Sequence, residues 1–153
     1  MKAVIQRVKD ASCTVDGTVT GRIDHGLLVY FCAEGGDTAD MLPKFLSKIV
    51  SLRIFEDDGG KMNLSLSDNG GSVLLISQFT LAADISRGRR PSFDGAMGAD
   101  EAEEFYEKAI SLLREMGIHT ECGVFGAHME IKYRNDGPVT IIADSEDIFR
   151  KKQ

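Results

Sequence analysis

The segment 77–81 (SQFTL) is the first candidate for chemistry, because its residue types do not fit the stretch in which it lies. Ser77, Gln78 and Thr80 interrupt an otherwise apolar run that begins at Val73. Polar groups on a buried strand must be hydrogen-bonded or used by the protein. The simpler interpretation is a strand that emerges at the edge of a sheet, and the segment taken alone slightly favours it.

The segment 135–138 (NDGP) is a second candidate, and it combines residues that favour a tight turn. It lies between two runs with strand character, Met129 to Arg134 and Val139 to Ala143, so we expect a hairpin here. A Gly-Pro bond can be cis, but only about 5 to 6% of X-Pro bonds in folded proteins are. By itself the segment predicts a turn.

A basic cluster of Arg87, Arg89 and Arg90 occupies one glycine-containing loop, and Lys132 and Arg134 are spaced to share one face of a strand. The net charge of the chain is -6, which discourages a nucleic-acid partner, because lysine and arginine supply most non-specific affinity for phosphates. The local cluster has two interpretations: contacts to a phosphate backbone, or solubilising charges in a loop.

Thiol and metal chemistry have little support in the sequence. The chain has three cysteines and three histidines: Cys13, Cys32, Cys122, His25, His119 and His128. The cysteines are odd in number without a C-x-x-C pair, and the histidines lack the spacing of a zinc site. We therefore expect small buried cysteines and no metal, with a thiol-dependent hydrolase using Cys122 or Cys32 as an alternative.

The first third of the chain is typical of β structure. The expected strands are Ala3 to Val8, Ser12 to Val15, Thr18 to Ile23 and Leu27 to Ala33. Asp16-Gly17 is a two-residue hairpin signal, because a type I′ turn needs positive φ at both central positions. The last of these strands is almost continuously apolar, so it should be covered on both faces.

Two helices follow from apolar residues at helical spacing. The first is expected over about 40 to 51, with Asp40 as its N-cap and Pro43 in the first turn. The second is expected to be capped by Asp100 and ended by Gly117. Further strands are expected at 52–55, 63–66, 73–81 and 118–121. The sequence thus predicts an α+β fold, a mainly antiparallel, curved, barrel-like sheet with two helices packed against it.

The 153 residues fit a single domain, with 42% hydrophobic and 27% charged residues as in globular proteins. The longest apolar stretch, Leu27 to Ala33, is too short to cross a bilayer, and the N-terminus does not resemble a signal peptide. We therefore expect a cytoplasmic protein. The charged residues 145–153 are expected to form a mobile tail.

Taken together and in this order, the segments 77–81 and 135–140 resemble the two signature motifs of the D-aminoacyl-tRNA deacylases. The resemblance covers nearly the whole chain, which implies a deacylase domain over residues 1–144; the tail past Ala143 is longer than is typical. Other stretches that carry the resemblance are 3–8 (AVIQRV), 60–64 (GKMNL), 71–74 (GSVL) and 90–93 (RPSF).

The resemblance implies a homodimer with two active sites at the subunit interface, needing no metal or organic cofactor. Ser77, Gln78, Phe79 and Thr80 would line the pocket for the terminal adenosine and the scissile ester of D-aminoacyl-tRNA. A cis Gly137-Pro138 would enter from the other protomer. The residues expected to bind substrate and select its chirality are Gly137, Pro138, Arg7 and Met129, with Arg7 holding the loop. Arg87, Arg89 and Arg90 would contact the tRNA backbone.

The implied chemistry needs a placed water and donors for the developing oxyanion, because an aminoacyl ester is already activated. The backbone N–H groups of Phe79 and Thr80 are the expected donors, and the 2′-hydroxyl of the tRNA could assist. Thr80 as nucleophile is the alternative, although no base lies near it in sequence. The same scheme predicts that glycyl-tRNA is cleaved and L-aminoacyl-tRNA excluded. A non-catalytic RNA-binding module using the arginine loop is the competing function, and it lacks an aromatic stacking platform in the sequence.

Overall fold

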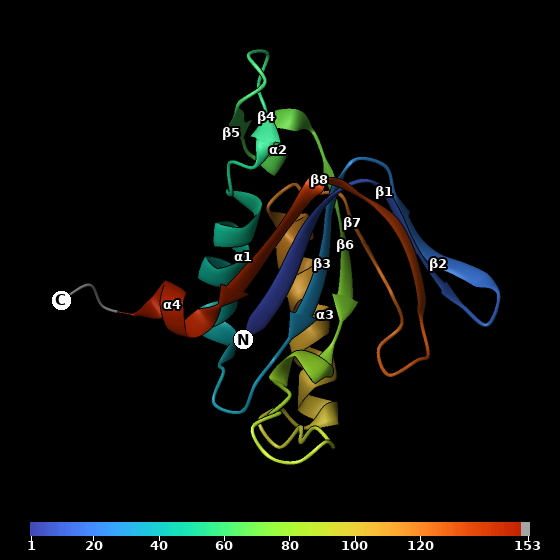
Figure 1. Ribbon diagram of the computed structural model, residues 1–153, viewed down its shortest axis with the longest axis vertical. Helices are drawn as coiled ribbons and strands as arrows, with labels where there is room; N and C mark the ends of the chain where they lie inside the picture. Colours follow the sequence, from blue (N-terminus) through green and yellow to red (C-terminus); the bar gives the residue numbers. More distant parts are fainter. Residues whose placement is uncertain (151–153) are drawn as a thin grey trace.

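The computed structural model describes residues 1–150 and has one curved six-stranded sheet with helices on its outer face (Figure 1). Five strands follow the order β2-β1-β3-β6-β7, and β8 pairs with the other edge of β1. The pairs β3-β6 and β6-β7 are parallel and the other three pairs are antiparallel. The strands are β1 Lys2–Val15, β2 Thr18–Ile23, β3 Gly26–Cys32, β6 Ser72–Ser77, β7 Thr120–Cys122 and β8 Glu130–Asp144.

The predicted hairpin between β1 and β2 is confirmed. Asp16 and Gly17 have φ values of 48° and 79°, as a type I′ turn requires. The sheet then curls until β2 approaches β7. Gly21 permits this approach, because a Cβ atom there would lie 2.5 Å from the carbonyl oxygen of Cys122.

Two hydrophobic cores lie on the two faces of the sheet. The larger lies under the helices α1 (Leu42–Val50) and α3 (Ala99–Glu115) and includes Val29 and Phe31 of β3. The smaller lies inside the curl of the sheet and includes Leu28. Since successive side chains of a strand point to opposite faces, β3 is covered on both faces, as predicted, and the predicted barrel-like sheet with two packed helices is confirmed.

The predicted helix caps are wrong. Asp40 lies within a 3-10 helix, η1 (Ala39–Met41), and the residue that precedes α1 is Met41. Asp100 lies in the first turn of α3, whose N-cap is Gly98. In the first turn, an acidic side chain still interacts favourably with the positive end of the helix. Gly117 follows the end of α3 with a φ of 80°, so the predicted end of this helix is confirmed.

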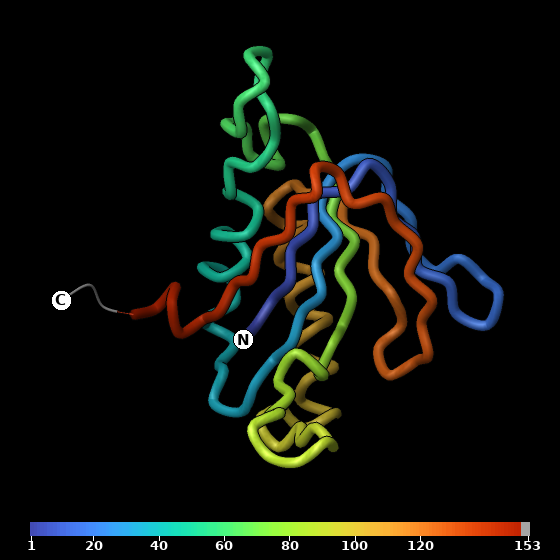
Figure 2. The backbone as a smooth tube through the Cα atoms, in the orientation of Figure 1, coloured from blue at the N-terminus to red at the C-terminus, as the bar shows by residue number. Residues whose placement is uncertain are grey.

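The predicted hairpin over 129–143 is also wrong, because β8 is one strand that pairs with β1 along nearly its whole length (Figure 2). Val8 pairs with Asn135 and Gln6 with Thr140. The residues 136–139 therefore bulge opposite Arg7 instead of reversing the chain. Within this bulge the Gly137-Pro138 bond is cis, as the family resemblance implied.

The middle of the chain forms a small separate hairpin, which projects from the body of the molecule (Figure 1). Its strands β4 (Phe55–Glu56) and β5 (Met62–Leu64) are shorter than the predicted ones, 52–55 and 63–66. The unpredicted helix α2 (Leu66–Asn69) follows at once. It starts there because Ser65 and Asp68 form a capping box.

Residues 145–149 form helix α4 (Ser145–Phe149) where the sequence suggested a mobile tail. Ser145 is buried: its N–H donates to the carbonyl oxygen of Met1 over 2.8 Å, and its hydroxyl accepts from the Met1 ammonium over 2.7 Å. Residues 151–153, the end of that suggested tail, lie outside the described residues. Of the helices within residues 1–150, none is long and apolar enough to span a membrane.

Candidate active site

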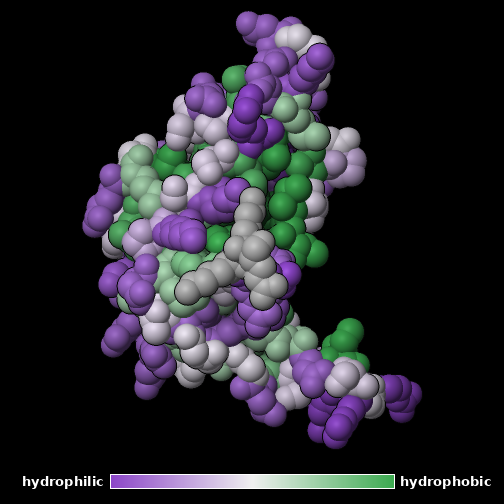
Figure 3. Space-filling model, turned by 90° about the vertical axis from the view of Figure 1, so that its left-hand side faces the viewer, coloured by the Kyte–Doolittle hydropathy of each residue, from purple (hydrophilic) through white to green (hydrophobic). Residues whose placement is uncertain are grey.

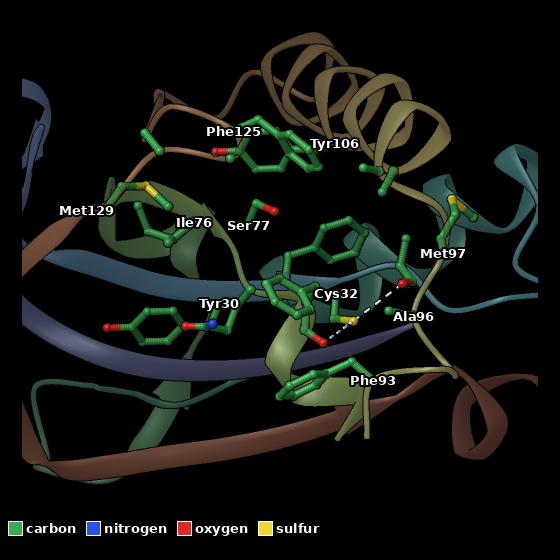
Figure 4. A pocket seen from close by; sticks show the side chains of 18 of the residues that line it. Tyr30, Cys32, Ile76, Ser77, Phe93, Ala96, Met97, Tyr106, Phe125 and Met129 are labelled. Atoms are coloured by element: carbon green, nitrogen blue, oxygen red, sulfur yellow. Dashed lines mark hydrogen bonds between the residues drawn. The ribbon is translucent and has the colours of Figure 1, made fainter. Parts of the chain in front are cut away.

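A cavity of about 600 Å³ opens where the parallel strands β3 and β6 end (Figure 4). We call it the β3–β6 pocket. Its wall is completed by the segment 93–97, by the first two turns of α3 and by the segment 125–129. The lining is mainly apolar, so a ligand inside it is largely shielded from water and its polar interactions are strengthened.

The segment 77–81 lies at the end of β6, where the pocket opens. The expected strand 73–81 is too long, because β6 stops at Ser77 and the chain turns into the 3-10 helix η2 (Phe79–Ala82). The N–H of Gln78 still donates to the carbonyl oxygen of Phe31 over 2.8 Å, which ties the turn to β3. Phe79 and Thr80 are the first two residues of η2, where backbone N–H groups have no acceptor within the helix.

Three of the four expected residues of this segment line the pocket: Ser77, Gln78 and Phe79. The hydroxyl of Thr80 instead accepts a hydrogen bond from Nε2 of Gln78 over 2.6 Å. Thr80 is exposed and is not part of the pocket lining among the described residues. The side chain of Thr80 is therefore held beside the pocket, while its backbone belongs to the turn at the entrance.

Aromatic side chains form two walls of the pocket. In the view of Figure 4, Tyr106 and Phe125 lie together on one side and Phe93 on the other. The Tyr106 and Phe125 rings are 5.9 Å apart, and the Tyr106 hydroxyl donates to the carbonyl oxygen of Leu75 over 2.6 Å. Burial raises the pKa of Tyr106. The Tyr106 ring is thus fixed as a neutral wall of the cavity.

Cys32 lines the pocket, but its environment does not favour a nucleophile. Its thiol is buried and lies 3.4 Å from the carbonyl oxygen of Ala33 and 3.6 Å from that of Phe79. Burial raises the pKa of Cys32 to about 11, and burial also raises the pKa of Cys122. Because the thiolate is the reactive form, both side chains are unreactive thiols at neutral pH.

The bulge of β8 lies away from this pocket and is tied to β1 by Arg7. The buried Arg7 side chain donates from Nη1 to the carbonyl oxygen of Ile54 over 2.7 Å and from Nε to that of Asp136 over 3.0 Å. Nε also lies 3.4 Å from a carboxylate oxygen of Asp136. Gly137 and Pro138 themselves are exposed. The bulge is thus an exposed backbone segment that the buried Arg7 side chain anchors.

Within one chain, the structure brings together only part of the predicted site. Met129 lines the pocket with the segment 77–79, whereas Arg7, Gly137 and Pro138 do not contribute to its lining in the part of the chain described. Arg87, Arg89 and Arg90 are exposed in the loop between Asp84 and Ser92.

Several lining residues were not predicted from the sequence. They come from segments far apart in the chain: Tyr30, Phe93, Tyr106, Phe125 and His128. Cys32 also lines the pocket, and the sequence suggested it only as an alternative nucleophile.

Comparison with protein families decides the assignment. The model of the D-Tyr-tRNA(Tyr) deacylase family matches residues 4–144. The chain belongs to this family. A D-aminoacyl-tRNA deacylase of Deinococcus radiodurans is 53% identical, with 94% of this chain and 99% of the relative covered. One of Fervidobacterium nodosum is 49% identical over 97% of this chain and 100% of the relative.

Solved structures support the same fold for this deacylase-family chain. A c-Myc DNA unwinding element binding protein superposes with a TM-score of 0.88 at 39% identity, covering 94% of this chain and 98% of the other. A probable eukaryotic D-amino acid tRNA deacylase superposes with a TM-score of 0.79 at 16% identity, covering 93% and 97%. The second likeness shows the shared fold alone.

Proposed function

We propose that this chain hydrolyses the ester bond of D-aminoacyl-tRNA in the β3–β6 pocket, as the names of its curated relatives suggest. The observation that carries the proposal is the turn at Gln78, which places two backbone N–H groups without helical acceptors at the entrance of a mainly apolar cavity. Such preorganised donors stabilise the oxyanion that forms when an ester is attacked. The reaction proofreads aminoacyl-tRNA, and its expected location is the cytoplasm, where this substrate is used.

In the proposed reaction, water attacks the ester carbonyl carbon and the carbonyl oxygen becomes an oxyanion held by the N–H groups of Phe79 and Thr80. The bond from the carbonyl carbon to the ribose 3′-oxygen then breaks. The attacking water loses a proton, and the adjacent 2′-hydroxyl of the tRNA would relay this proton to the 3′-oxygen as it leaves. The side chains serve mainly to position the ester, which is sufficient because the aminoacyl ester is already activated.

The proposal is tested by incubating the purified protein with D-tyrosyl-tRNA, alone, with a chelator and with a thiol-blocking reagent. We expect turnover in all three conditions, because burial raises the pKa of Cys32 and, at its half-buried position, that of Cys122, so both thiols are protonated at neutral pH. Turnover that stops with the thiol reagent would favour a thiol-dependent hydrolase. Tight binding of tRNA without turnover would favour a non-catalytic RNA-binding module.

The substitution Thr80→Ala separates two forms of the mechanism. The Thr80 hydroxyl accepts from Gln78 beside the pocket, so we expect it to be a bystander and the variant to keep activity within about tenfold of wild type, or roughly 1.4 kcal/mol of barrier. Single-turnover deacylation of D-tyrosyl-tRNA measures this, with Thr80→Ser as the matched control. A loss of several orders of magnitude in Thr80→Ala alone would identify Thr80 as the nucleophile.

The proposed active unit is a homodimer in which Gly137 and Pro138 of one protomer enter the β3–β6 pocket of the other. Three observations support it: the bulge is exposed, the buried Arg7 side chain donates a hydrogen bond to its Asp136 carbonyl oxygen, and it lies away from the pocket of its own chain. The outer edge of β8 also has no strand partner among the described residues, and Ile142 on this strand is 77% exposed. Apolar side chains are visible at the surface on this side of the molecule (Figure 3).

The arginine loop is proposed to contact tRNA phosphates, and it predicts a shallow dependence of binding on salt. Arg87, Arg89 and Arg90 are exposed in a chain of net charge -6. We therefore expect about two to four phosphate contacts, and the slope of the logarithm of affinity against the logarithm of salt concentration should correspond to that number. Titrations of labelled tRNA at several salt concentrations measure the slope. Arg89→Gln should reduce the slope, and a slope as steep as that of a dedicated duplex binder would contradict the prediction.

A further inference from the structure

Phe79 and Phe93 form an aromatic pair at the entrance of the β3–β6 pocket. Their ring centroids are 5.1 Å apart and the rings are inclined by 75°, an edge-to-face arrangement. Both residues line the pocket, yet Phe79 is 57% exposed. The Phe79 ring therefore contacts Phe93 on one side, and the rest of it is accessible at the entrance of the pocket.

The pair is continuous with the basic loop. Asp84 and Ser92 exchange two backbone hydrogen bonds, of 2.8 and 3.0 Å, which close the loop that carries Arg87, Arg89 and Arg90. Phe93 follows Ser92 directly. The segment 79–93 thus supplies both the cationic loop and, at its two ends, the aromatic pair. Proteins bind single-stranded nucleic acid with this combination, because arginines contact the phosphates and bases stack on aromatic rings.

We propose that Phe79 and Phe93 form a stacking site for the base of the nucleotide that precedes the terminal adenosine of tRNA. This inference rests on the proposed function, in which the terminal adenosine carries the ester into the pocket. The RNA chain must then leave past the entrance, where Phe79 is exposed and the arginines are in the same segment. The 3′ end of tRNA is single-stranded, so the base of the preceding nucleotide is available for stacking.

The test compares three D-tyrosyl esters: that of adenosine, that of cytidylyl-3′,5′-adenosine, and that of the same dinucleotide with its first base removed. For the wild-type protein we expect kcat/KM to rise by about fivefold to 100-fold from the first ester to the second, the range that corresponds to one stacked base. The abasic ester should lose most of this gain, because it lacks the base that stacks. It keeps the added phosphate and therefore controls for the effect of that charge. Equal kcat/KM for the second and third esters would overturn the proposal.

Variants of the pair test which side chains supply the gain. Phe79→Leu and Phe93→Leu should reduce the ratio of kcat/KM between the dinucleotide and adenosine esters toward that of the abasic ester, whereas Phe79→Trp should keep it. The matched control is Phe149→Leu, which should leave the ratio unchanged. It removes a ring that packs under Lys44 and is not part of the described pocket lining.

A fall in activity by the same factor on the adenosine and dinucleotide esters, in both leucine variants, would overturn the stacking site and assign the rings to folding or to a protein contact. Sedimentation of the same variants shows whether that contact is the partner protomer. If the wild-type protein hydrolyses none of the three esters and no D-tyrosyl-tRNA, the proposed function itself fails. Hydrolysis of the adenosine ester without any gain from the added base would leave the function standing and remove this inference alone.

Discussion

D-tyrosyl-tRNA and glycyl-tRNA are expected to be deacylated, and L-alanyl-tRNA to be spared by at least about 100-fold, or roughly 3 kcal/mol of barrier. The reason is steric. A backbone carbonyl of Gly137 or Pro138 from the partner protomer would accept a hydrogen bond from the substrate ammonium, while the N–H groups of Phe79 and Thr80 hold the ester carbonyl. Two directions then remain at Cα, for the hydrogen atom and the side chain.

Handedness decides which of these directions the side chain takes. A D side chain would point toward solvent, whereas an L side chain would meet backbone atoms, and a clash with backbone cannot be relieved by a change of rotamer. Discrimination by exclusion needs no pocket shaped for a particular D side chain. Glycine has hydrogen in both directions and should therefore be accepted.

The measurement is a deacylation series on D-tyrosyl-, D-alanyl-, glycyl- and L-alanyl-tRNA at one enzyme concentration. The two D substrates should differ little from each other, which controls for effects of side-chain size. Appreciable hydrolysis of L-alanyl-tRNA, or complete protection of glycyl-tRNA, would refute exclusion by backbone carbonyls even for a D-specific enzyme.

Two inactive variants should restore activity when they share a dimer. Gly137→Val should deform the bulge, because Gly137 has a φ of 132°, which residues with a side chain rarely adopt, and a Cβ atom there would lie 2.9 Å from a methyl group of Val139. Met129→Arg should block the pocket that Met129 lines. Each variant alone is expected to lose at least about 100-fold in activity.

Mixed after dissociation and reassembly, the two variants should recover about a quarter of wild-type activity, because about half of the dimers combine one of each and such a dimer has one intact site. Deacylation of D-tyrosyl-tRNA measures the recovery, and each variant reassembled alone is the control. Activity of the mixture equal to the average of the separate variants would show that the bulge and the pocket act within one chain, or that the bulge has no part in the reaction.

The sequence predicts best those elements that local chemistry determines. The Asp16-Gly17 turn, the strand covered on both faces and the end of α3 at Gly117 depend on a few neighbouring residues, and the structure confirms them. The predicted hairpin over 129–143 failed for a physical reason. Its turn residues are real turn formers, but β1 is long enough to pair with both halves of β8, and this pairing outweighs the preference for a reversal.

The site shows the same division between local and distant information. The segment 77–79 is predicted from a motif and Met129 from the family resemblance, and both line one pocket. No local pattern predicts the contact between Phe79 and Phe93, because the two residues meet only after η2 and the loop that follows have folded back. Single sequences carry no direct sign of such contacts, so the aromatic surface of Phe79 and Phe93 is recognised only in the folded chain.

The pairing of β1 with β8 joins residues near opposite ends of the chain, with Lys2 opposite Asp144. During synthesis, β1 emerges from the ribosome before the strands with which it pairs. It can pair early with β2 and β3, but its other edge has to wait for a strand made more than a hundred residues later. Contacts so distant in sequence form slowly, because the intervening chain must be ordered first. The nascent protein therefore carries an open strand edge until β8 has been made, and this edge is where premature association with a neighbouring nascent chain is expected to begin.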